Sequence, residues 1–221
     1  MTDGALMQQD TTSVVTPAFS RDWLVAALRG VARGEGEGVT AVRHPLGFIC
    51  LPIQRHGPLG LCVHVWTSRL AQATPTTSTV HCHSWALHSQ VLYGSVRNTV
   101  MSTEESASPT HRVYEVHSSG GRDELRATPQ VVRCTERSTE VRTAGDVYTL
   151  AAGVFHTTDV ASDEETATAV FGQTLDDGTD LSLGPVEGQT HTVQRRYCDA
   201  AETELAARIV VDRLVETVRH A

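Results

Sequence analysis

The feature that most constrains this fold is a succession of short strand-like segments between residues 45 and 175, where no helical period is found. Each segment is rich in β-branched and apolar residues, and turn residues fill the gaps. About ten segments follow one another: LGFICLPI, GLCVHVW, STVHCHSW, SQVLYGSVRNTVM, HRVYEV, VVRC, STEVRTAG, DVYTL, GVFHTTDV and TATAVFGQT. Helices do not alternate with these strands, which argues against a parallel α/β sheet. The sequence therefore predicts an all-β antiparallel sandwich or barrel.

Two amphipathic helices are predicted on either side of these strands. Ser20 can cap a helix that ends near Gly34, and Asp199 with Glu202 has capping-box spacing at the start of a second helix over about 199–219. The apolar positions are Trp23, Leu24, Ala27, Leu28 and Val31 in the first helix, and Leu205, Ile209, Val210, Leu214 and Val218 in the second. Their three- and four-residue spacing predicts that both helices pack against the strands.

The composition fits one globular domain, because 40% of the 221 residues are hydrophobic and 20% are charged. Residues 1–19 are polar and aperiodic, which predicts a flexible arm, and residues 20–221 form the domain, with a core barrel over about 45–175. No apolar run approaches the roughly 20 residues that span a bilayer. The first residues lack a secretory signal, so we expect a cytoplasmic protein.

Charge and cysteine content restrict the partners. The net charge is −8 and the basic residues are spread singly, so we expect neither a nucleic-acid partner nor a membrane partner. Five cysteines without CxxC spacing indicate neither a disulfide framework nor a zinc finger, and we expect reduced, mostly buried thiols. The sequence neither predicts nor excludes a homodimer.

The most informative polar residues are a pair of histidines, His81 and His83, separated by one cysteine. On a strand, residues two apart project from the same face, so both imidazoles would point into a barrel if that face is internal. With 11 histidines in the chain, roughly 0.5 such pairs are expected by chance, so the pair alone does not establish a metal site.

Glycine spacing around the pair supplies the support. The segment HCHSWALHSQVLYG and the later segment GDVYTLAAGVFH resemble the two motifs of the cupin superfamily, G-x5-H-x-H-x3,4-E-x6-G and G-x5-P-x-G-x2-H. The matched positions are His81, His83, Gly94, Gly145, Gly153 and His156. The resemblance covers about residues 47–175 and implies a cupin-type antiparallel β-barrel, or jelly roll. It also implies that His81, His83 and His156 bind a metal ion.

Three positions depart from the cupin motifs. Thr76 or its neighbours replace the first glycine, and Ala151 replaces the proline, and both changes concern turns. His88 stands where the glutamate ligand is expected, so it is a candidate fourth ligand, with a packing or solvent-facing role as the alternative. Its odd offset from His83 opposes ligation on an unbroken strand, but a turn or bulge in the intervening residues can reset the alternation.

Three or four neutral imidazoles suit divalent transition metals such as iron, nickel, copper and zinc. Within the cupins, the chain resembles the thiol dioxygenase branch that includes cysteine dioxygenase, which has three histidines and no carboxylate ligand. That branch implies iron(II), with nickel as the alternative, and an arginine that clamps the substrate carboxylate. Arg55 is the best-placed candidate for this role and Arg69 is the reserve.

Two features of animal-type cysteine dioxygenases are absent. They carry a cysteine where His88 lies, cross-linked to a tyrosine, and a Ser-His-Tyr relay where this chain reads TATAVFGQT. Tyr93 and Tyr148 are therefore the candidate phenols for proton transfer.

The leading hypothesis is a mononuclear metal oxygenase that uses dioxygen and a small polar, sulfur-containing amino acid such as cysteine. The alternatives are an oxygen-independent cupin isomerase or lyase, and a cupin that binds a small molecule without catalysis.

Overall fold

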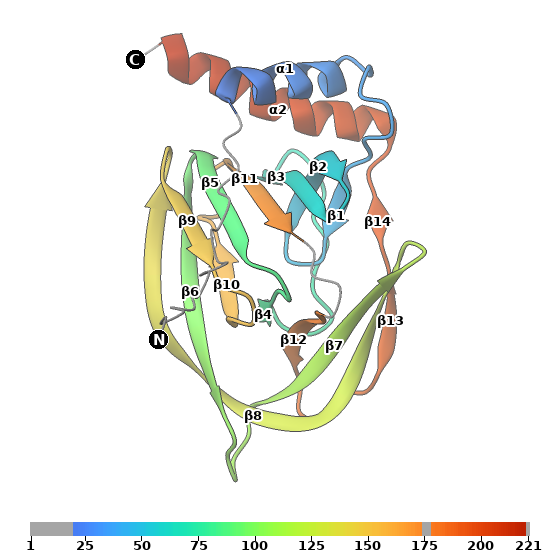
Figure 1. Cartoon of the computed structure of the whole chain (residues 1–221), viewed down its shortest axis with the longest axis vertical. Coiled ribbons are helices and arrows are strands. Elements are labelled where there is room, and N and C mark those ends of the chain that lie inside the picture. The colour runs from blue at the N-terminus through green and yellow to red at the C-terminus, as the bar shows by residue number, and fades with distance from the viewer. Residues whose placement is uncertain (1–19, 174–177, 220–221) are drawn as a thin grey trace, which may run out of the picture.

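The computed structural model describes residues 20–173 and 178–219 of the chain. Two seven-stranded antiparallel sheets face one another, and two helices cover one of them (Figure 1). Sheet A has the order β14 (Arg196–Tyr197), β1 (Val42–His44), β2 (Phe48–His56), β3 (Leu59–Trp66), β11 (Thr166–Gln173), β5 (Leu87–Tyr93) and β9 (Val147–Leu150). Sheet B has the order β13 (His191–Gln194), β8 (Arg122–Thr143), β6 (Ser95–Glu104), β10 (His156–Asp159), β4 (His81–Cys82), β12 (Asp180–Gly184) and β7 (His111–Ser119). The structure therefore confirms the prediction of a mostly β, antiparallel fold with a helix near each end of the described chain.

Both predicted helices are present, and both begin as their capping residues indicate. The Ser20 hydroxyl accepts a hydrogen bond from the Trp23 amide at the start of α1 (Arg21–Ala32). Asp199 and Glu202 exchange reciprocal hydrogen bonds between side chain and backbone where α2 (Ala200–Arg219) begins. Trp23 departs from the prediction, because 40% of it is exposed and the helix buries Leu24, Leu28 and Val31 instead. Neither helix is long and apolar enough to cross a membrane in the described part of the chain.

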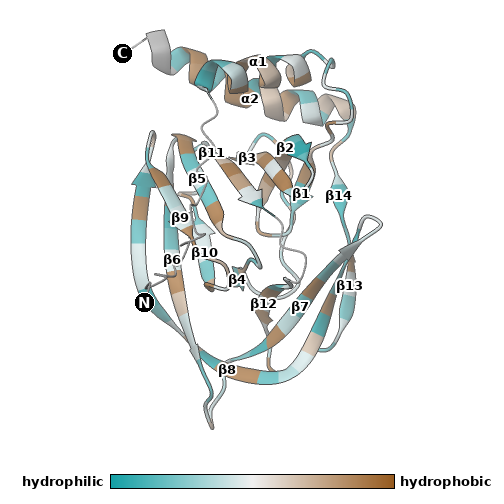
Figure 2. Cartoon of the chain, in the orientation of Figure 1, coloured by the Kyte–Doolittle hydropathy of each residue, from teal (hydrophilic) through white to brown (hydrophobic). Residues whose placement is uncertain are grey.

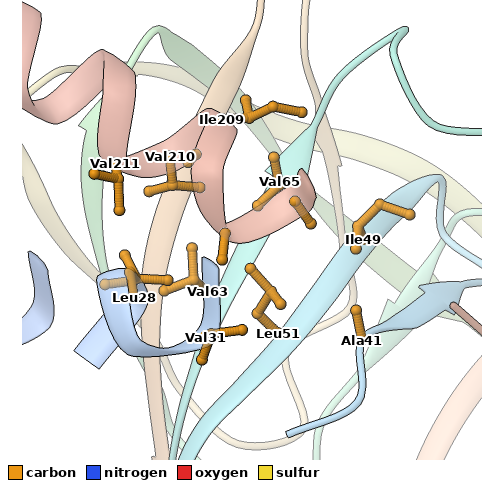
Figure 3. Close-up of a cluster of buried hydrophobic side chains, with 14 of the residues drawn as sticks. Leu28, Val31, Ala41, Ile49, Leu51, Val63, Val65, Ile209, Val210 and Val211 are labelled. Carbon is orange, nitrogen blue, oxygen red and sulfur yellow. The ribbon is translucent and has the colours of Figure 1, made fainter. Parts of the chain in front are cut away.

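Sheet A separates an apolar core from a cavity, because successive side chains along its strands point to opposite faces. Ile49, Leu51, Val63 and Val65 are fully buried and pack against the two helices, as Figure 3 shows. The residues between them on β2 and β3 point to the other face, toward sheet B. Figure 2 shows alternating bands of hydrophobic and hydrophilic colour along other strands, such as β7 and β8. One face therefore stabilises the fold and the other lines the cavity.

The strands differ from the predicted segments mainly in length. STVHCHSW contributes only the two residues of β4, and Gly94 divides SQVLYGSVRNTVM into β5 and β6. VVRC and STEVRTAG belong to one long strand, β8, which pairs with β7 through its first half and with β6 through its second. Four strands were not predicted: β1, β12, β13 and β14. The arm at residues 1–19 lies outside the described residues.

Gly94 is one of the motif glycines that the structure explains. Its φ is 74°, and a Cβ there would lie 2.3 Å from the Thr166 hydroxyl oxygen and 2.8 Å from the Glu165 carbonyl oxygen. Exchange of Gly94 for Ala should therefore cost about 2–4 kcal/mol of unfolding free energy, from left-handed strain together with overpacking. Urea denaturation of the purified variant measures this cost.

Gly145 provides the matched control, because its φ of 92° is also in the left-handed region but no atom lies within 4 Å of the position that an added Cβ would take. Its exchange for Ala should cost only about 1–2 kcal/mol, which is the backbone strain alone. Equal losses of unfolding free energy in the two variants would show that glycine is not needed at position 94 because of the close contact with Thr166 and Glu165.

Candidate metal centre

Three histidines converge in the structure as the two motifs predict. His81 on β4 and His156 on β10 are direct partners in the antiparallel register, and His83 follows β4 immediately. The ring centroids of His81 and His156 are 4.3 Å apart, and those of His81 and His83 are 4.9 Å apart. One nitrogen from each of the three rings lies within 4.8 Å of the other two, so the cluster can hold a metal ion.

Backbone carbonyls fix the orientation of two of these rings. The His81 Nδ1 is 2.9 Å from the Thr79 carbonyl oxygen, and the His156 Nδ1 is 2.9 Å from the Val154 carbonyl oxygen. Because a carbonyl can only accept, each Nδ1 carries the proton and each Nε2 keeps a free lone pair. Donation of the second ring N–H to a carbonyl is the usual support of a histidine that binds a metal.

An acidic residue supports the third ring. The Asp180 Oδ2 lies 3.9 Å from the His83 Nδ1, and the Asp180 Oδ1 accepts hydrogen bonds from the Ser84 amide and hydroxyl. Burial alone would raise the pKa of Asp180, but His83 and Ser84 hold it below its usual value. The carboxylate is therefore ionised and lies beside the Nδ1 edge of the His83 ring, at a distance longer than a direct hydrogen bond.

The protonation state of the cluster favours metal binding. Burial lowers the pKa of His156 to about 4. Burial, together with the neighbouring His156 and His83, lowers the pKa of His81 well below its usual value. Both imidazoles are consequently neutral at pH 7, as metal coordination requires.

His83 also stacks on Trp85, with ring centroids 4.5 Å apart and an interplanar angle of 29°. Trp85 in turn fills the space above Gly172 on β11, where a Cβ would lie 2.4 Å from the indole ring. We predict that Gly172→Ala displaces Trp85 and loosens His83, which should weaken metal affinity about tenfold and destabilise the fold by about 1–3 kcal/mol. Metal titration and urea denaturation measure these two effects.

Gly60 on β3 is the matched control, because it is the direct register partner of Gly172 and has nothing within 4 Å of an added Cβ. Gly60→Ala should keep the wild-type affinity. An unchanged metal affinity in Gly172→Ala would show that the stack of His83 on Trp85 does not contribute to metal binding.

The cluster opens on a cavity of about 610 Å³ between the two sheets. On the sheet A side, Phe48 stacks between His44 and His64, with centroid distances of 4.4 Å and 4.2 Å. Burial lowers the pKa of His44 to about 4 and that of His64 well below its usual value, so these rings are neutral too. At another part of the lining, Arg195 makes a bidentate ion pair with Asp123. The cavity lining thus combines an aromatic stack on sheet A with a charged pair elsewhere.

The other residues predicted for the site divide between the cavity and the rest of the fold. Arg55 and Tyr148 line the cavity, whereas Arg69 and Tyr93 are not among the lining residues. Tyr93 is buried in the core on the helix side of sheet A, and its hydroxyl has no hydrogen-bond partner among the described residues. The Arg69 amide donates to the Thr67 hydroxyl in the loop that follows β3.

The structure does not bring His88 to the cluster. It lies on β5 in sheet A, and its Nδ1 is 3.1 Å from the Thr149 hydroxyl on the neighbouring β9. His88 belongs neither to the metal-binding group nor to the lining of the cavity. The segment between His83 and His88 leads from sheet B to sheet A, and on β5 it is Leu87 that faces the cavity. We therefore describe the centre as a three-histidine site.

Several lining residues had no motif to reveal them, among them His44, His64, Asp180 and the pair Asp123 and Arg195. The available signal was alternation: His64 shares its strand parity with Cys62 and Trp66, between buried valines. A comparison with protein-family models finds no match, and a comparison with curated proteins finds none either.

Proposed function

We propose that this chain is a cupin-type jelly-roll enzyme, a mononuclear metal oxygenase that acts on a small polar, sulfur-containing amino acid such as cysteine. The observation that carries the proposal is the convergence of His81, His83 and His156 on one point, with no carboxylate among these three donors and with His81 and His156 neutral. Such a donor set leaves the full charge of a divalent ion uncompensated, which favours an anionic substrate group.

The three imidazoles would hold iron(II), or alternatively nickel, through their Nε2 atoms. Iron(II) bound there would supply the electrons for reaction with dioxygen and an attractive position for a thiolate. The protein contributes the fixed ring orientations and a cavity within the size range of small-molecule sites.

Arg55 is the candidate for binding the substrate carboxylate. It lines the cavity at the exposed end of β2 and forms no ion pair with any residue in the described ranges 20–173 and 178–219. A guanidinium with free donors can bind a carboxylate through two hydrogen bonds. We predict that Arg55→Gln raises KM by about 10- to 100-fold, the value of a charged hydrogen bond, and leaves metal content unchanged. Steady-state kinetics of the metal-loaded variant test this, and an unchanged KM would exclude Arg55 from substrate binding.

Tyr148 is the candidate for proton transfer. It lines the cavity from β9, and burial raises the pKa of its phenol. A protonated phenol at this place can donate a hydrogen bond to a bound substrate, and Tyr148→Phe tests that role through kcat. Tyr93 lies on the opposite face of sheet A and is not retained as a candidate.

The test of the function is metal analysis of the native protein, followed by oxygen-uptake assays with a panel of small thiols and mass spectrometry of the products. We expect oxygen-dependent oxidation of one or more thiols. This activity should be lost when a chelator is added. Turnover that continues without dioxygen would favour the isomerase or lyase instead. Ligand binding without turnover under either condition would favour a binding protein.

A further inference from the structure

Two cysteines lie side by side on the sheet A wall of the cavity, whereas the three-histidine cluster belongs to the sheet B wall. In the register of β2 and β3, Cys50 is opposite His64, so Cys62 is the diagonal neighbour on the same face. Both side chains line the cavity, and each thiol shifts the pKa of the other. The pair was not expected from the sequence, where the two cysteines are separated by a turn at His56-Gly57-Pro58.

The pair differs from the other three cysteines in its access to ligands. Cys82 and Cys198 are buried, and Cys134 lies on β8 outside the cavity lining. Cys50 and Cys62 are partly exposed and belong to the cavity lining, where a small molecule can approach them.

The surroundings make the two thiols unequal. Interaction with Cys50 lowers the pKa of Cys62 against the effect of burial. Interaction with Cys62, together with burial, raises the pKa of Cys50. The positive charge of Arg55 lowers the pKa of both thiols. Cys62 therefore has the character of an attacking thiolate, and Cys50 holds the proton.

We propose that Cys50 and Cys62 form a site of thiol–disulfide exchange, at which a small organic disulfide that enters the cavity is reduced. The proposal rests on the pairing of two accessible thiols and does not depend on the metal centre or on the proposed oxygenase activity.

The exchange is balanced by the two cysteines and the disulfide alone. The Cys62 thiolate attacks one sulfur of R–S–S–R, forms a Cys62–S–S–R bond and releases RS⁻. Cys50 then attacks the Cys62 sulfur, forms the Cys50–Cys62 disulfide and releases the second RS⁻. The protons of the two thiols are taken up by the two leaving thiolates. Two cysteines are oxidised, and one disulfide is reduced to two thiols.

The sequence allows a direct test by peptide mapping. Cleavage after arginine places Cys50 in the peptide 44–55 and Cys62 in the peptide 56–69, with one cysteine in each. The full chain is incubated with hydroxyethyl disulfide in the presence of a chelator, alkylated and digested with trypsin. We expect peptides 44–55 and 56–69 to be joined by a disulfide, with release of two mercaptoethanol molecules per chain.

Single variants separate the two roles. In Cys50→Ser, Cys62 should keep a stable mixed disulfide with mercaptoethanol, because no second thiol resolves it. In Cys62→Ser, Cys50 should react no faster than Cys134. In the wild-type chain Cys62 should react at least about tenfold faster than Cys134, whose pKa is raised by burial.

The matched control is Cys134→Ser, which should form the linked peptides at the wild-type rate. The proposal is overturned if the wild-type chain yields no linked peptide, or if Cys62 and Cys134 react at equal rates. Because these readings come from the wild-type chain itself, they hold even if a cysteine variant fails to fold.

Discussion

Replacement of His156 by Ala should remove metal binding while the fold persists. The remaining pair, His81 and His83, supplies only two ligands, and changes to residues that merely support a ligand already cost about 10- to 100-fold in affinity. Loss of a ligand itself should therefore weaken binding by more than about 100-fold, and any metal-dependent turnover should disappear with it. Metal content after dialysis and titration with a competing chelator measure the loss, and circular dichroism reports the fold.

His88→Ala is the matched control, because it also removes a motif histidine but one that contacts Thr149 rather than the cluster. It should keep wild-type metal affinity. A His156→Ala protein that still binds metal tightly would show that the second motif has been misread. A large loss of affinity in His88→Ala would return this residue to the metal centre.

The metal cluster could be predicted from the sequence because its three histidines match the two cupin motifs, which join His156 on the distant strand β10 to His81 and His83. The two-residue spacing of His81 and His83 places both on one face. The glycines around His156 mark the turns before and within the second motif. His88 shows the limit of the motif, since its position in the pattern suggested a ligand while the chain had already left sheet B for sheet A.

The remaining features depend on pairing between distant segments, which local patterns do not encode. The strands β12 and β14 are five and two residues long, and their partners lie more than 60 residues away. Tertiary pairing outweighs local propensity in such short strands. The sequence alone could have predicted part of the cavity wall, because apolar and other residues alternate along β2 and β3. The alternating residues are Ile49, Leu51, Val63 and Val65 on one face and Cys50, Cys62 and His64 on the other. No sequence pattern predicted that sheet B covers the face of sheet A that carries Cys50, Cys62 and His64.

Acidification should destabilise the metal-free protein strongly, because His44 and His64 are neutral in the folded cavity wall. Burial is the first cause for both. At His44 the charges of His83 and Arg195 add to the effect of burial, while Asp123 and Asp180 oppose it. At His64 the charges of His44 and His83 add to the effect of burial. A histidine whose pKa is lower in the folded state takes up its proton first in the unfolded state. Stability is therefore full above the unfolded pKa of about 6.5 and falls as the pH is lowered toward the folded value.

For His44, whose pKa is lowered to about 4, the loss amounts to about 2 kcal/mol between pH 7 and pH 5. His64 acts in the same direction, so the wild-type chain should lose more than this. Urea denaturation at the two pH values, in the presence of a chelator, measures the difference. The double variant His44→Gln, His64→Gln removes both titrating groups from the aromatic wall and should flatten the dependence by at least about 2 kcal/mol.

His56→Gln is the matched control for this measurement, because His56 is exposed at the end of β2 and lies outside the stack with Phe48. Its pH dependence should equal that of the wild-type chain. If the double variant keeps the wild-type slope as well, His44 and His64 are hydrated in solution and the cavity wall is wetter than the structure shows. If the slope falls only in the double variant, the neutral state of these imidazoles is established independently of any metal, and with it the burial of the wall that faces the three-histidine cluster.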